Sequence, residues 1–134
     1  MSAEARKDVV RYWWSKAEES LASAHRELEA GSYVFAVNRV YYAAFYGVSA
    51  ALLDRHLSFT KHSGVRAVFH REFIKTGQLD VGWGRFYDQV YEDRQEGDYV
   101  ALSAFDRTYV ESQLDRCTQF LSTLRLHVSF LSTD

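Results

Sequence analysis

Apolar residues recur at steps of three and four positions along most of this 134-residue chain, and no proline interrupts them. Because this spacing places apolar side chains on one face of an α-helix, the pattern predicts helices. Proline interrupts helices, so its absence suits a mostly helical chain. Glycines separate the periodic segments. The pattern predicts five helices, over residues of about 3–30, 32–56, 63–76, 83–96 and 103–131.

The predicted fold is an all-α bundle. Three of the expected helices are long and two are shorter, and long amphipathic helices with short connections pack as antiparallel bundles. No segment shows the alternation of a β-strand. The length suits a single domain. We therefore expect an up-and-down bundle of four to five helices, forming one domain over residues 1–134.

Individual residues mark the ends and faces of these helices. Gly31 is a natural stop for the first helix, and Ser32 and Ser63 are predicted N-caps. Cys117 falls in the apolar seam of the last helix, where an inert core thiol is expected. The second helix has two apolar stripes, so it either lies centrally or uses one side for a partner. Its second stripe consists of Phe35, Arg39, Tyr42, Tyr46 and Ser49.

Several classes of protein are excluded by composition and motif. The longest apolar run, residues 40–53, is shorter than the roughly 20 residues that span a bilayer. No secretory leader is visible, and a single cysteine permits neither an internal disulfide nor a cysteine-based zinc site. The chain lacks Glu-x-x-His, His-Glu-x-x-His, a Gly-rich phosphate loop and Gly-x-Ser-x-Gly. We expect no metal and no cofactor.

Charge is unevenly distributed, although the net charge is only −2. Residues 55–75 contain five lysines and arginines, three of the five histidines and one acid, whereas residues 80–98 contain six acids and two arginines. Two interpretations explain this charge distribution equally well. The charged residues either form two solvated faces, or the basic ones form a local phosphate-binding region on the third helix.

Arg94 occupies a position where the pattern of the fourth helix expects an apolar residue. The stripe runs through Trp83, Tyr87 and Val90 before it reaches Arg94. A buried guanidinium needs a partner, because an unpaired buried charge is costly. One interpretation is a structural ion pair at the helix end, with Asp98 or a backbone carbonyl, and the other is a functional site.

Two further groups are candidates for binding. Arg39 shares a stripe with Tyr42 and Tyr46, and tyrosines beside an arginine can stack on it or form hydrogen bonds. The alternative is an ordinary core helix with an amphipathic flank. Lys61 and His62 precede Ser63, and His62 could bind phosphate or simply cap the turn.

Together these residues resemble the HEPN family of small prokaryotic all-helical proteins. The resemblance covers residues of about 10–125 and rests on four pieces in order: Trp14-x-x-Ala17, the run from Asn38 to Phe45, the run from Lys61 to Val65, and the run from Arg94 to Tyr99. It implies a homodimeric up-and-down bundle in the cytoplasm, often paired as a toxin with a minimal nucleotidyltransferase as antitoxin. Active members are metal-independent endoribonucleases, with an arginine followed after four to six residues by a histidine at the dimer cleft.

The chain departs from that motif, because Tyr99 follows Asp98 where the histidine is expected. The resemblance nominates Arg94, Asp98 and Tyr99 as catalytic residues. It nominates Arg39, Tyr42, Lys61 and His62 as residues that bind RNA or a nucleotide. The alternative function is a non-catalytic module that binds a nucleotide or holds the partner enzyme. Tyr99 is also a candidate to receive adenylate from that partner.

Overall fold

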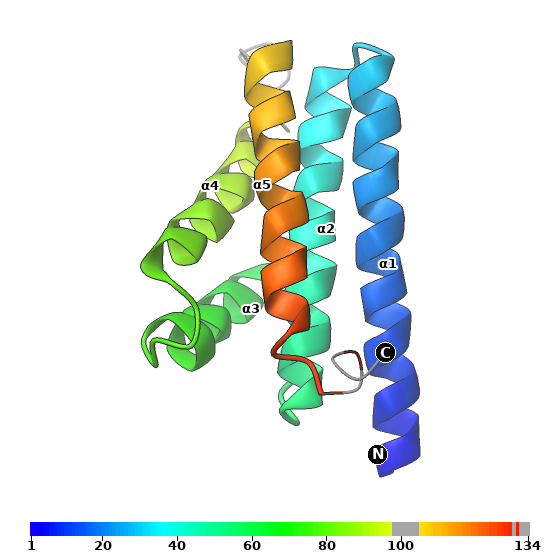
Figure 1. The fold of residues 1–134 in the computed structure, drawn as a ribbon, viewed down its shortest axis with the longest axis vertical. Helices are drawn as coiled ribbons and strands as arrows, with labels where there is room; N and C mark the ends of the chain where they lie inside the picture. The colour runs from blue at the N-terminus through cyan, green and yellow to red at the C-terminus, as the bar shows by residue number, and fades with distance from the viewer. Residues whose placement is uncertain (98–104, 130, 132–134) are drawn as a thin grey trace.

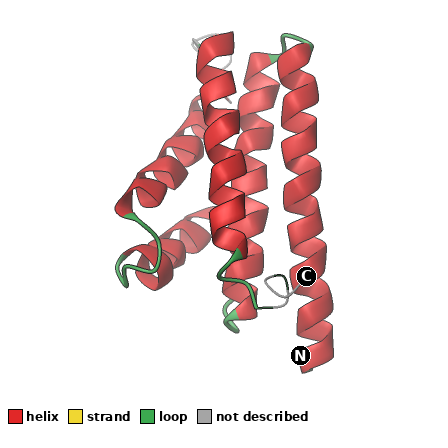
Figure 2. Ribbon diagram, in the orientation of Figure 1, coloured by secondary structure: helices red, strands yellow, loops and turns green. Residues whose placement is uncertain are grey.

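The computed structural model describes residues 1–97, 105–129 and 131, and these residues form α-helices and no strand. Figure 2 shows this all-helical fold. The prediction of an all-α fold is confirmed. The helices are α1 (Ala3–Glu29), α2 (Tyr33–Asp54), α3 (His62–Phe69), α4 (Val81–Gly97) and α5 (Arg107–Arg125), with a short π-helix η1 (His70–Ile74) continuing α3.

The three long helices α1, α2 and α5 lie side by side, and α3 and α4 cover one flank at an incline (Figure 1). Helices α1 and α4 run in one direction, and α2 and α5 run in the other. Helix α2 contacts α1, α3, α4 and α5, so it is the central element of the bundle. This position explains why its sequence is apolar on more than one side.

The turn between α1 and α2 follows from Gly31. Its φ angle of 77° lies in the left-handed region, which glycine adopts without steric cost. The N–H of Gly31 donates to the carbonyl of Leu28, and the N–H of Ser32 donates to the carbonyl of Glu27. This pair of hydrogen bonds is the Schellman motif, so the predicted stop is confirmed. Ser32 occupies the N-cap position of α2, but its side chain makes no capping hydrogen bond.

Close packing of the long helices depends on Gly47 in the middle of α2. A Cβ atom at this position would lie 2.6 Å from Cδ2 of Leu121 in α5 and 3.6 Å from Cζ3 of Trp14 in α1. The missing side chain therefore lets α1, α2 and α5 approach one another. Cys117 is fully buried in the same core, and burial raises its pKa to about 12, as expected for an inert thiol.

One predicted helix end and one predicted N-cap are wrong. Helix α5 ends at Arg125, not at Leu131, although Leu131 remains buried. After the helix end, Ser129 donates to the carboxylate of Asp54, the last residue of α2, at 2.8 Å through its hydroxyl and 3.1 Å through its backbone N–H. Helix α3 begins at His62 after Lys61, so Ser63 lies inside the helix and does not cap it.

Candidate functional site

Arg94 lies in the last turn of α4 and its side chain is half-buried against α2. Its Cζ atom is 5.4 Å from the ring centroids of both Tyr41 and Tyr42. One terminal nitrogen donates to the hydroxyl of Tyr42 at 3.2 Å. The buried Nε has no hydrogen-bond partner among the described residues. The guanidinium therefore rests on tyrosine rings and retains an unused donor.

Arg94 has no ion-pair partner among the described side chains. None of their carboxylates lies within ion-pair distance of this guanidinium. Asp98, which the ion-pair interpretation named, lies outside the described residues, as does Tyr99. Among the described residues, the guanidinium contacts the two rings of α2, and such cation–π contacts are worth roughly 0.5–2 kcal/mol each, depending on exposure.

His62, the first residue of α3, packs on the same part of α2. Its ring stacks on Phe45 with centroids 4.3 Å apart and planes inclined by 6°. Its Nδ1 lies 2.7 Å from the hydroxyl oxygen of Tyr41. The ring also meets Tyr42 edge to face at 5.9 Å. We refer to Arg94, Tyr41, Tyr42, Phe45 and His62 as the Arg94 cluster.

Electrostatics keep the imidazole of this cluster neutral. Burial lowers the pKa of His62 below its ordinary value of 6.5, and the positive charge of Arg94 lowers it further. Burial raises the pKa of Tyr41 well above 10.0, so its hydroxyl keeps its proton. Either Tyr41 donates to Nδ1, or Nδ1–H donates to the Tyr41 oxygen and leaves Nε2 as a proton acceptor.

The other predicted binding residues lie at the edge of the cluster. Arg39 approaches the ring of Tyr42, with its Cζ 5.1 Å from the centroid, and its Nε donates to Asn38 at 3.2 Å. Tyr42 therefore contacts two guanidinium groups. Lys61 is exposed and directly precedes His62 at the start of α3. The structure thus brings Arg39, Tyr42, His62 and Arg94 together, with Lys61 next to them.

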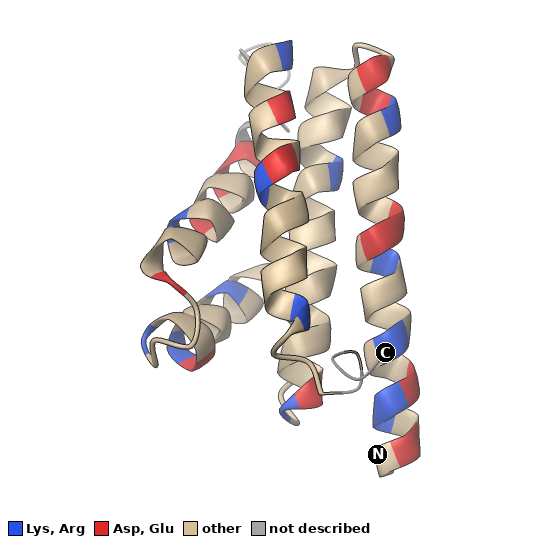
Figure 3. Ribbon diagram, viewed as in Figure 1, with Lys and Arg blue, Asp and Glu red and all other residues tan. Residues whose placement is uncertain are grey.

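The basic segment of the sequence is partly neutralised by the acidic segment. Asp88 in α4 accepts from Arg66 Nε at 2.8 Å and lies 2.9 Å from His70 Nε2, both on the α3–η1 segment. The ribbon of α3 carries basic positions and that of α4 carries acidic ones, as the blue and red segments in Figure 3 show. Arg66 also lies over Tyr91, at 4.6 Å from the ring centroid. Sequence reasoning missed this network, because nothing in the spacing pairs Asp88 with α3.

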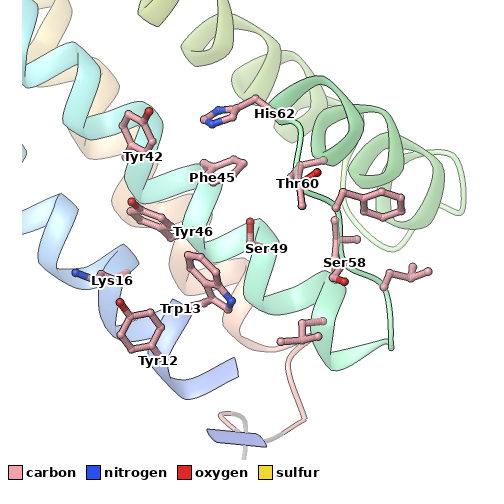
Figure 4. Close-up of a pocket in the computed structure, with 15 residues that line it drawn as sticks. Tyr12, Trp13, Lys16, Tyr42, Phe45, Tyr46, Ser49, Ser58, Thr60 and His62 are labelled. Carbon is pink, nitrogen blue, oxygen red and sulfur yellow. The ribbon is translucent and has the colours of Figure 1, made fainter. Parts of the chain in front are cut away.

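An open groove of about 600 Å³ adjoins the Arg94 cluster, and we call it the aromatic groove. It lies between α1, α2 and the segment that leads into α3 (Figure 4). Tyr42, Phe45 and His62 form part of its wall. Further lining residues are Tyr12, Trp13, Lys16, Tyr46 and Phe59. The sequence analysis did not predict the groove residues on α1. The sequence indicates them only in that Tyr12 and Trp13 lie outside the apolar seam of their helix.

Two negative findings apply to the described part of the chain. No three side chains of His, Cys, Asp or Glu within it gather as a metal site would require. None of the helices found there has the length and hydropathy needed to cross a membrane.

Comparison with known proteins identifies relatives. The family model described as "HEPN domain" matches residues 10–127. A Thermotoga maritima protein named "UPF0332 protein" is 43% identical over 116 residues, which cover 87% of this chain and 88% of the relative. A Methanocaldococcus jannaschii protein named "putative toxin" is 37% identical over 84% of this chain and 77% of its own length. The chain belongs to the HEPN family.

Proposed function

We propose that this chain is a HEPN toxin whose partner is a minimal nucleotidyltransferase, and that it cleaves RNA without a metal ion. The Arg94 cluster carries the proposal, because a half-buried guanidinium and an imidazole with a lowered pKa pack on the same two tyrosines of α2. A positive charge that stabilises the phosphate and a proton acceptor are two groups that phosphodiester cleavage needs. The "putative toxin" names of two Methanocaldococcus jannaschii relatives support the biological role.

In the proposed reaction the ribose 2′-hydroxyl attacks the adjacent phosphate. A bond forms between phosphorus and the 2′ oxygen, and the bond from phosphorus to the 5′ oxygen breaks. The products are a 2′,3′-cyclic phosphate and a free 5′-hydroxyl. Arg94 stabilises the negative charge that develops on the phosphate oxygens. A base takes the proton of the 2′-hydroxyl, and a second group returns a proton to the leaving oxygen.

His62 is the base that we propose. When Nδ1–H donates to the oxygen of Tyr41, the lone pair of Nε2 is free to accept the proton. The lowered pKa of His62 keeps the ring neutral at pH 7. This arrangement supplies from α3 the imidazole that is missing after Arg94 in the sequence. Asp98 and Tyr99 remain predicted members of the site, with Tyr99 orienting the phosphate.

We further propose that two copies of the chain form the cleft, each contributing one Arg94, and that the dimer acts in the cytoplasm. The half-buried position of Arg94 suits a site that a second subunit closes. Light scattering of the purified protein tests the dimer. A monomer at micromolar concentration contradicts a shared cleft.

Cleavage of labelled single-stranded RNA and tRNA in the presence of a chelator tests the activity. Arg94→Ala is expected to lower the rate by about 100-fold or more, because one lost oxyanion donor typically costs that much. Arg116→Ala is the matched control. It also removes an arginine that lies over an aromatic ring, that of Trp83, but Arg116 is not part of the Arg94 cluster. Equal rates for all three proteins contradict the proposal, provided that their circular dichroism agrees.

A second candidate function is a non-catalytic module that binds a nucleotide or the partner enzyme. The absence of a histidine four to six residues after Arg94 favours it. In that case the chain co-purifies with a nucleotidyltransferase and cleaves no RNA. Under either function Tyr99 is a candidate for adenylation, and an adenylate-sized gain in intact mass after co-expression with the partner tests this.

A further inference from the structure

The aromatic groove exposes rings that a folded chain normally buries. Tyr12 is 56% exposed and Phe59 is 40% exposed, and both line the groove. Trp13 stacks on Tyr46 across α1 and α2, with centroids 5.4 Å apart and planes inclined by 24°. A cluster of exposed rings around one cavity indicates a surface that contacts another molecule. Figure 4 shows Tyr12, Trp13 and Tyr46 on one side of the opening.

We propose that the aromatic groove binds unpaired nucleobases of single-stranded RNA, whose phosphates pass Lys16 and the Arg94 cluster. The inference rests on the proposed function, and it adds the substrate class that this site accepts. Aromatic side chains bind single strands by stacking, because every base offers a flat face once it is unpaired. A base held in a duplex cannot enter such a groove, so the groove restricts the substrate to unpaired RNA.

The groove is physically continuous with the proposed catalytic residues. Tyr42 and His62 belong both to the groove wall and to the Arg94 cluster. The hydroxyl of Tyr42 accepts from Arg94 at 3.2 Å, so the guanidinium lies directly behind that wall. A base stacked in the groove would contact Tyr42 and His62, and the next phosphate along the strand would pass the edge of the groove to reach Arg94, which does not line it.

Charge favours a polyanion over a second protein surface. The groove lining includes the ammonium group of Lys16 and contains no carboxylate among the described residues, although Lys16 lies 3.9 Å from Glu19 just outside the lining. A smaller recess of about 190 Å³ adjoins it and shares Lys16 and Tyr46 with it. That recess adds Arg26 and Arg39 and one acid, Glu19. Lysine and arginine that follow a row of rings are typical of single-strand binding sites.

Size and polarity also suit a base. A volume of about 600 Å³ lies within the usual range of small-molecule pockets, roughly 300–1,000 Å³. The wall includes the hydroxyl side chains of Ser49, Ser58 and Thr60. Hydroxyls among apolar rings can pair with the edges of a base while the rings hold its faces.

The test compares two labelled ten-nucleotide strands by fluorescence anisotropy. One is 2′-O-methyl RNA, which has no free 2′-hydroxyl and cannot be cleaved, and the other carries the same phosphates without bases. Phe59→Ala is expected to weaken binding of the first strand by at least about fivefold and to leave binding of the abasic strand unchanged. Phe35→Ala is the matched control, because Phe35 is 66% exposed on α2 but does not line the groove.

Lys16 provides a second, electrostatic readout. Lys16→Gln is expected to reduce the slope of log affinity against log salt by about 0.7, the effect of one lost phosphate contact on a single strand. The inference is overturned if the wild-type protein binds both strands equally, or if Phe59→Ala and Phe35→Ala bind alike. It is also overturned if Phe59→Ala changes the oligomeric state and not the RNA affinity, because the groove is then an interface between copies.

These outcomes separate the inference from the proposed function. The binding assay uses a strand that cannot react, so a protein without ribonuclease activity can still show base binding in the groove. Conversely, if Arg94→Ala abolishes cleavage of RNA while Phe59→Ala leaves both binding and cleavage unchanged, the endonuclease stands and the base site is rejected.

Discussion

The Nδ1 of His62 lies 2.7 Å from the hydroxyl oxygen of Tyr41, and this contact ties the first residue of α3 to the centre of α2. Arg94 of α4 lies over the same tyrosine ring, at 5.4 Å. Three helices thus meet at one buried phenol. The neutral imidazole and the guanidinium both contact Tyr41, so we expect a substitution at one of them to change the properties of the other.

The first prediction concerns the titration of His62. The positive charge of Arg94 contributes to the low pKa of this imidazole, so Arg94→Ala should raise the pKa toward 6.5. NMR titration of the imidazole C–H signals measures the change. Arg116→Ala should leave the His62 pKa where it is. A wild-type His62 that already titrates at 6.5 or above contradicts the electrostatic description of the cluster.

The second prediction concerns stability as the pH falls. The unfolded chain protonates His62 near pH 6.5, whereas the folded chain does so only at lower pH. The unfolded state therefore binds more protons below about pH 6.5, and the free energy of unfolding decreases as the pH drops toward the folded pKa. His62→Gln should lessen this decrease between pH 7 and pH 5 in urea titrations. An unchanged pH dependence contradicts the prediction.

The third prediction concerns the aromatic core between α4 and α5. Phe120 is fully buried and packs on Phe69, Trp83 and Phe86. Phe120→Ala should lower the free energy of unfolding by about 3–5 kcal/mol, through lost burial and the cavity that remains. Phe35→Ala removes the same atoms from an exposed site and should change the free energy of unfolding by less than about 0.5 kcal/mol. Urea denaturation of both variants provides the comparison, and equal losses would contradict this packing.

The fourth prediction concerns His56, which follows the end of α2 with a φ angle of 66°. A side chain in this left-handed conformation costs about 1–2 kcal/mol, and glycine avoids that cost. His56→Gly should raise the free energy of unfolding by up to about 1 kcal/mol, since the greater freedom of the unfolded chain offsets part of the gain. His56→Ala keeps the steric conflict and should give no gain. Thermal unfolding compares His56→Gly with His56→Ala. Equal melting temperatures would contradict the steric cost of the left-handed conformation at this position.

The elements that depend on local periodicity could be predicted from the sequence alone. The helical segments, the stop at Gly31 and the buried seams of α1 and α5 follow from spacing that recurs within each helix. Arg94 also stood out locally, as a charge at an apolar position of its own stripe. The glycine and the periodic side chains act within a few residues of themselves, so their effects can be predicted without knowing the rest of the fold.

Which of these residues meet depends on how the helices pack. His62 joins Arg94 because α3 and α4 pack on the same side of α2, and the rings of Tyr12 and Phe59 face one groove because α1 and the segment before α3 flank that helix. The segment after α5 likewise bonds to a residue distant in sequence, since Ser129 donates to Asp54. Periodicity describes one helix at a time, whereas contacts between helices depend on how the side chains of several segments fill a shared space.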